Sequence, residues 1–141
     1  KNDYDWHPER SPEGPITIVI SSADHAMYVY RNGNPIGRAS VEIGGRVLSR
    51  SDKLGNHVFT MLEGTTGKPS RFTPNHQEAR WMRVTSEGRP VDADTLASRL
   101  RFSPDFADKL ANELKPGTTV IVTDYPVVRK PKSDSALFAA E

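Results

Sequence analysis

Side chains that can do chemistry are few and scattered along this chain of 141 residues. The chain contains no cysteine, which excludes disulfides, thiolate metal sites and cysteine nucleophiles. No two of the four histidines share a metal-ligand spacing, because each stands in a different segment: His7, His25, His57 and His76. We therefore expect no metal and no cofactor, and we expect the histidines to lie on the surface or in loops.

Serine is the remaining candidate nucleophile. A serine hydrolase places this residue on a sharp Gly-x-Ser-x-Gly turn, and the sequence contains no such motif. The weak candidates are Ser98 as the nucleophile and His76 as its base, although neither residue lies in an activating motif. The residues by themselves thus give little support to hydrolysis.

Arginine side chains form the third group that can act on a ligand. They are concentrated in the second half of the chain, at Arg71, Arg80, Arg83, Arg89, Arg99 and Arg101. Arginine binds carboxylates in a bidentate manner, so these residues are candidates for an anion site. The alternative is a solvated face of mixed charge. The 19 Lys and Arg nearly balance the 18 Asp and Glu, and the net charge of +1 argues against nucleic acid as a partner.

The elements that must position these residues are mostly strands. Alternating apolar residues predict strands over residues 16–20, 26–31, 36–43, 56–62 and 79–85, and a β-branched run predicts another over 118–123. The polar stretch 63–78 is predicted to be a long loop.

Two helical segments are predicted in the second half of the chain. The longer one begins after Ser103, an N-cap candidate, and has Pro104 in its first position. Its apolar face comprises Phe106, Leu110 and Leu114, which recur every four residues. We therefore expect a helix over 106–114 that packs against the strands.

The composition, with 35% hydrophobic and 26% charged residues, is that of a polar but foldable single domain. Residues 1–14 are predicted to be a lead-in or linker, 15–125 the domain and 126–141 a tail. No apolar run approaches the roughly 18 residues that cross a bilayer, so we expect no membrane insertion by this segment. The chain begins at Lys1, and we expect a signal or anchor upstream. The predicted core is Ile16, Ile18, Ile20, Val29, Ile43, Phe59, Phe106, Leu110, Val120 and Val122.

The order of these motifs resembles the L,D-transpeptidase catalytic domain, the YkuD-like family. The motifs are Pro15-Ile-Thr-Ile-Val-Ile20, Met27-Tyr-Val-Tyr-Arg-Asn-Gly33, Ala39-Ser-Val-Glu-Ile-Gly44, Leu54-Gly-Asn-His-Val-Phe59 and Leu110-Ala-Asn-Glu-Leu-Lys-Pro-Gly-Thr-Thr-Val-Ile-Val122. The resemblance covers about residues 15–124 and implies a mainly β fold, a curved β-sandwich or partly closed barrel with one or two short helices. It also implies a bacterial protein of the periplasm or cell envelope. Members of the family join or trim peptidoglycan stem peptides through a cysteine thioester.

The sequence departs from this family at the catalytic motif, which reads Ser-x-Gly-Cys-hydrophobic-Arg and is preceded by a His-Gly pair. With Arg101 aligned to the arginine of the motif, Arg99 stands at the cysteine, Ser98 at the glycine and Leu96 at the serine. Shifting by one residue would place Ser98 at the cysteine but lose the arginine match, so we prefer the first register. No His-Gly pair occurs.

These departures imply a pseudoenzyme that keeps the fold and lacks the chemistry. We expect it to bind peptidoglycan stem peptides or a cell-wall enzyme, with Arg99, Arg101 and Arg83 meeting carboxylates. The alternatives are an active peptidoglycan enzyme with a nucleophile other than cysteine, such as Ser98, and a purely structural or interaction domain.

The segment 92–103 tests the pseudoenzyme interpretation, because in the family it forms the loop that presents the cysteine. Here it contains no glycine, and Leu96 and Leu100 lie four residues apart behind Asp92 or Asp94 as a cap. We therefore predict that the segment is partly helical, that both leucines point inward, and that no histidine reaches Ser98.

Overall fold

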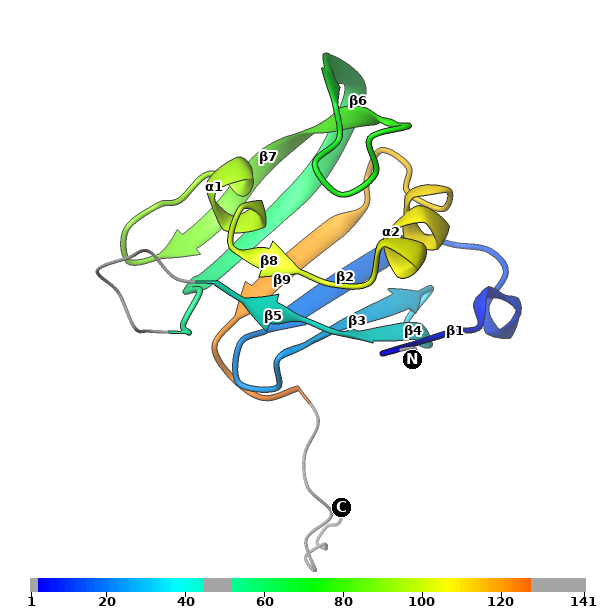
Figure 1. Ribbon diagram of the computed structural model, residues 1–141, viewed down its shortest axis with the longest axis horizontal. Coiled ribbons are helices and arrows are strands. Elements are labelled where there is room, and N and C mark those ends of the chain that lie inside the picture. The colour runs from blue at the N-terminus through cyan, green and yellow to red at the C-terminus, as the bar shows by residue number, and fades with distance from the viewer. Residues whose placement is uncertain (1–2, 45–51, 128–141) are drawn as a thin grey trace, which may run out of the picture.

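The structure is a computed structural model that describes residues 3–44 and 52–127. Seven strands form one mixed sheet in the order β1-β4-β3-β2-β9-β6-β7, and β5 and β8 form a small antiparallel pair (Figure 1). Their bounds are β1 (Tyr4–Trp6), β2 (Ile16–Ser21), β3 (Ala26–Arg31), β4 (Asn34–Ser40), β5 (Glu42–Ile43), β6 (Asn56–Pro69), β7 (Gln77–Glu87), β8 (Leu100–Arg101) and β9 (Thr119–Thr123). Only β2 and β9 are parallel among the neighbouring strands of the large sheet.

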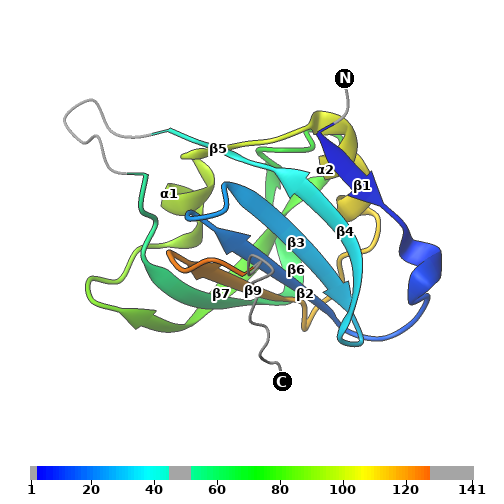
Figure 2. The same ribbon diagram turned by 90° about the horizontal axis from the view of Figure 1, so that it is seen from below.

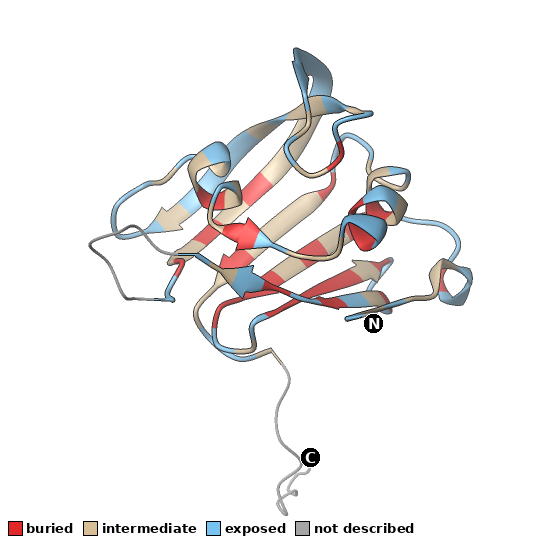
Figure 3. Cartoon of the chain, viewed as in Figure 1, coloured by how far each residue is buried: buried red, intermediate tan, exposed pale blue. Residues whose placement is uncertain are grey.

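The second layer consists of the helices α1 (Ala93–Ala97) and α2 (Pro104–Ala111) and the β5–β8 pair, all on one face of the sheet (Figures 1 and 2). A single-turn 3₁₀ helix, η1 (Pro8–Arg10), follows β1. Buried residues gather on the central strands and on α2 (Figure 3). The mainly β prediction is thus confirmed. The large sheet ends at β1 on one side and at β7 on the other, and these two strands do not pair with each other in the part that the structure describes.

Helix α2 forms where the sequence predicted a helix. The Ser103 hydroxyl caps it by accepting a hydrogen bond from Phe106 N at 3.2 Å, and Phe106 and Leu110 are buried. The helix ends at Ala111, earlier than predicted, because Glu113 and Leu114 bond three residues back in tighter turns. Leu114 still packs against the core.

The segment 92–103 is partly helical, as predicted. Asp92 caps α1 by accepting a hydrogen bond from Thr95 N at 3.0 Å. Leu96 on this helix and Leu100 on β8 are both buried against the sheet. The segment contains no glycine, and its helical turn places both leucines against the sheet.

The predicted loop over 63–78 is wrong for most of its length. β6 continues to Pro69 and β7 begins at Gln77, so the two strands form a long hairpin. The pairing shifts register beyond Leu62, where Gly64 and Gly67 adopt φ angles of 85° and 87°. These irregularities break the two-residue alternation by which a strand is recognised in a sequence.

The predicted lead-in over 1–14 contributes a strand. β1 pairs with β4 in antiparallel register, and Trp6 stands edge-on to Phe106 with ring centroids 5.6 Å apart. The domain therefore begins well before residue 15. Tyr4 and Trp6 both pack against the core on either side of the exposed Asp5, but a strand of three residues is too short to give a periodic signal in the sequence.

Two further expectations change in detail. The return strand predicted over 36–43 divides into β4 and β5, with the buried Val41 between them. The predicted core is buried except for Ile43 and Val120, which are half-buried and pack against it. Residues 128–141 of the predicted tail lie outside the described residues. Neither helix in the described ranges is long and apolar enough to cross a membrane.

Candidate functional site

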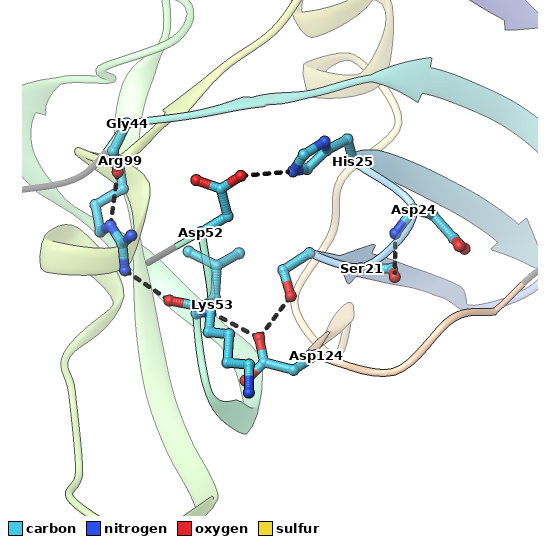
Figure 4. Close-up of polar contacts among 10 residues, drawn as sticks. Ser21, Asp24, His25, Gly44, Asp52, Lys53, Arg99 and Asp124 are labelled. Atoms are coloured by element: carbon cyan, nitrogen blue, oxygen red, sulfur yellow. Dashed lines mark hydrogen bonds and ion pairs between the residues drawn. The ribbon is translucent and has the colours of Figure 1, made fainter. Parts of the chain in front are cut away.

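Arg99, at the position that the resemblance assigns to the catalytic cysteine, is bound to main-chain carbonyls (Figure 4). Its Nε donates to Gly44 O at 2.7 Å and its Nη1 to Lys53 O at 2.9 Å. Gly44 N in turn donates to Arg99 O at 2.7 Å. The guanidinium thus ties the end of α1 to the segments that follow β5 and precede β6, which is an architectural role.

The other two arginines expected to bind carboxylates stand on different elements. Arg101 is exposed on β8 and lines a shallow hollow with Asp24 and Arg38. Arg83 is exposed on the edge strand β7, where its charge acts on Asp92. Arg83, Arg99 and Arg101 have different neighbours among the described residues. The structure therefore does not bring the three arginines together in one anion site.

The weak catalytic candidates do not form a pair. The Ser98 hydroxyl ends α1 by donating to Thr95 O at 2.7 Å. His76 follows the hairpin turn, and its Nε2 lies 3.2 Å from Asn112 Oδ1. Within residues 3–44 and 52–127, no histidine forms a hydrogen bond with Ser98, in agreement with the prediction for this segment.

A different serine and histidine do meet. His57 on β6 is buried, contrary to the surface or loop position expected for it, and its Nδ1 lies 2.8 Å from Ser86 Oγ on β7. Its Nε2 lies 3.1 Å from Leu54 O, an acceptor, so Nε2 carries the proton and Nδ1 accepts from the serine. A signal for burial was present, because His57 shares its strand face with Phe59.

The surroundings of His57 are closely fitted. Gly55 adopts a φ of 88°, and a Cβ at this position would lie 2.6 Å from His57 Nε2, so only glycine fits. A hollow of about 280 Å³ adjoins the pair and is lined in part by Asn56, Glu87 and Thr123. This arrangement is that of a nucleophile, its base and a group that orients the base. The Ser86 hydroxyl has the place of the nucleophile, His57 that of the base, and the Leu54 carbonyl that of the orienting group.

A groove of about 690 Å³ lies between the β6–β7 hairpin and the two helices. Its apolar lining includes Phe72, Trp81, Ala97 and Leu114. Its polar lining includes Arg71, His76, Glu78, Arg80, Asp92 and Asp94. An apolar floor with a few polar groups at the rim is typical of a ligand-binding groove. Sequence reasoning missed it, because its walls come from segments that are far apart in the chain.

Both signs of charge are present along this groove. Arg71 Nη2 lies 3.1 Å from Asp94 Oδ1, which links the hairpin side to α1. Hydrogen bonds from Thr95 lower the pKa of Asp92, which is therefore ionised at neutral pH. Arg80 donates to Glu63 O at 3.0 Å. A ligand that carries both a carboxylate and an amino group would find partners of opposite charge here.

His76 has one buried nitrogen, Nδ1, without a hydrogen-bond partner in the described part of the chain. Such groups are rare in folded proteins, and this one belongs to a residue that lines the groove.

Among the described residues, no group of three or more His, Asp or Glu side chains is placed to hold a metal ion. Comparison with models of protein families, with curated proteins and with solved structures finds no match to this chain. What the protein does must therefore be inferred from the geometry of its own residues.

Proposed function

We propose that this chain is a noncatalytic, L,D-transpeptidase-like domain of the bacterial cell envelope that binds peptidoglycan stem peptides in the groove between the β6–β7 hairpin and the helices. The observation that carries the proposal is the role of Arg99. At the position of the catalytic cysteine, this residue binds the carbonyl oxygens of Gly44 and Lys53. In this proposal, the position that holds the nucleophile in the family supports the fold in this chain.

The side chains at and beside the cysteine position support the proposed lack of catalysis there. The sequence contains no cysteine, and a guanidinium stays protonated and cannot attack a carbonyl carbon. Ser98, the residue before Arg99, donates its hydroxyl proton to the Thr95 carbonyl oxygen. Among the described residues, no histidine forms a hydrogen bond with Ser98 that would activate it as a nucleophile. We infer that substrate-like molecules bind without being cleaved.

The groove supports the choice of ligand. A stem peptide is an extended chain that carries carboxylate and amino groups together, and the groove offers Arg71 and Arg80 alongside Glu78, Asp92 and Asp94. These arginines replace Arg99 in the role that the sequence suggested for it. Arg101, exposed on β8, remains available for a carboxylate outside the groove.

Titration with a stem tetrapeptide, followed by calorimetry and by amide chemical shifts, tests the proposal. We expect saturable binding that perturbs α1 and the β6–β7 hairpin and that weakens about ten-fold or more in Arg71→Ala. Arg89→Ala is the matched control, because it removes an exposed arginine that does not line the groove. If the folded protein shows no saturable binding, the stem peptide is excluded and a cell-wall enzyme partner remains as the ligand.

The pair of Ser86 and His57 supports a second candidate, an active peptidoglycan hydrolase with a serine nucleophile. In this reaction the Ser86 hydroxyl would attack a peptide carbonyl while Nδ1 of His57 accepts its proton. The C–N bond would break as His57 returns that proton to the leaving amine, and water, with His57 again as the base, would then hydrolyse the acyl-serine ester to a carboxylic acid and free Ser86. Incubation with stem peptides and analysis of the products decides between the two candidates. Turnover that Ser86→Ala abolishes and Ser98→Ala leaves unchanged would replace the noncatalytic proposal.

A further inference from the structure

An apolar cavity of about 170 Å³ lies in the core between the sheet and the two helices. Every residue that lines it is apolar, among them Ile20, Phe59, Leu96, Leu100 and Val120. Protein cores contain few voids larger than a water molecule, because an empty space forfeits packing contacts. The cavity is partly open, so a group from outside the domain has access to it.

The volume sets the size of that occupant. In another protein, an engineered apolar cavity of about 150 Å³ stays free of water and binds benzene. The cavity here is of the same order, so it has room for a phenyl ring or a branched aliphatic group and not for a long alkyl chain.

The cavity adjoins the groove. Phe72, Trp81, Ala93, Ala97 and Leu114 line both spaces, so they form the boundary between them. Ala93 and Ala97 lie four residues apart on α1 and therefore on one face of the helix. Their methyl groups are the smallest part of this boundary, and a side chain that enters from the groove would pass beside them.

We propose that this cavity receives an aromatic or branched aliphatic side chain of a protein partner whose main chain lies in the groove. The inference shares the groove with the proposed function but names another ligand, because the charged side chains and methyl groups of a stem peptide leave the cavity unfilled. His76 supports a peptide main chain in this place. His76 lines the groove, and with Nε2 donating to Asn112 Oδ1, its buried Nδ1 is an acceptor that has no partner among the described residues.

Two blocked tripeptides that differ only in the central side chain test the inference, acetyl-Gly-Phe-Gly-amide and acetyl-Gly-Ala-Gly-amide. We expect the phenylalanine peptide to shift the methyl resonances of Leu96, Leu100 and Val120 in a saturable manner. The alanine peptide should bind about ten- to a hundred-fold more weakly, because it leaves the cavity empty. Equal affinity of the two peptides, or no binding of either one to the folded protein, would overturn the inference.

Variants at the boundary locate the binding site. Ala97→Phe places a ring at the opening and should abolish binding of the phenylalanine peptide, whereas Val84→Phe adds the same ring at an exposed position of β7 and should leave it unchanged. Ala93→Leu, one turn earlier on α1, is the second variant if the first does not fold. Binding that survives closure of the opening would place the phenyl ring elsewhere and refute the inference.

The two proposals fail separately. Stem-peptide binding that depends on Arg71, without any preference for the phenylalanine peptide, would leave the proposed function intact and remove the partner side chain. A preference for the phenylalanine peptide without any binding of the stem peptide would support the partner side chain and exclude the stem peptide.

Discussion

The two helices cover the same face of the sheet but complete the core in different ways. Each is short and is capped at its N-terminus by a side-chain oxygen, from Asp92 in α1 and from Ser103 in α2. Helix α2 inserts Phe106, which is fully buried. Helix α1 presents Ala93 and Ala97 to the apolar cavity instead.

The aromatic side chains explain this difference. Phe106 lies among Tyr4, Trp6 and Phe102, with ring centroids 5.5, 5.6 and 6.2 Å away. These contacts join α2 to the N-terminal strand β1 and fill the core around Phe106. The half of the core under α1 has no comparable ring inserted from its helix. We conclude that the rings around Phe106 stabilise the core beside α2, whereas the core under α1 borders an apolar cavity, to which Leu110 and Leu114 also contribute.

Among the variants that compare the two helices, Phe106→Ala is expected to change the free energy of unfolding most. Removing a fully buried ring should lower the free energy of unfolding by about 3–5 kcal/mol, because it leaves a cavity and releases β1 from α2. Urea unfolding followed by circular dichroism measures the loss. Met82→Ala, on exposed β7, is the control and should change stability by less than about 0.5 kcal/mol. A small loss for Phe106→Ala would show that stability does not reside in the α2 half.

A matched pair of enlargements compares the two helices directly. Ala107→Leu on α2 should destabilise by about 1–3 kcal/mol, because Ala107 is buried and the larger side chain would crowd its neighbours. Ala97→Leu on α1 should stabilise by about 0.5–2 kcal/mol, because the new methyl groups enter the cavity. The same unfolding measurement serves for both variants. Equal losses in the two would contradict the presence of room under α1.

The smallest expected effect concerns how the free energy of unfolding depends on pH. We expect α1 and α2 to show the same direction of dependence. The hydrogen bond from Tyr4 lowers the pKa of Asp105 in α2, and hydrogen bonds from Thr95 lower the pKa of Asp92. The folded-state pKa of each lies below the unfolded value, so the stabilisation is complete above about pH 4 and is lost as the pH falls through the folded-state pKa. Asp105→Asn and Asp92→Asn should each reduce the fall in stability below pH 4.

Urea unfolding between pH 2.5 and 6 measures this slope. Asp108→Asn, on the exposed side of α2, is the control for loss of a carboxylate. If one aspartate variant leaves the acid slope unchanged while the other flattens it, the two halves differ in electrostatics as well as in packing.

The sequence by itself determined the features that depend on near neighbours in the chain. Alternation identified β2 and β3 and the face on which Ile16, Ile18 and Ile20 are buried. Capping residues located the starts of α1 and α2, and four-residue spacing placed Phe106 and Leu110 inward. These signals are local, because a cap and a helical face are made within one or two turns.

Only the tertiary structure decided the features that depend on distant contacts. The strand β1 exists because Trp6 meets Phe106, and the Ser86–His57 pair exists because β6 and β7 fix a register between residues 29 apart. The groove and the cavity are spaces between the hairpin, the helices and the sheet. The volume of a groove or cavity depends on how closely side chains from separate elements pack together. A sequence pattern within one element therefore cannot predict it.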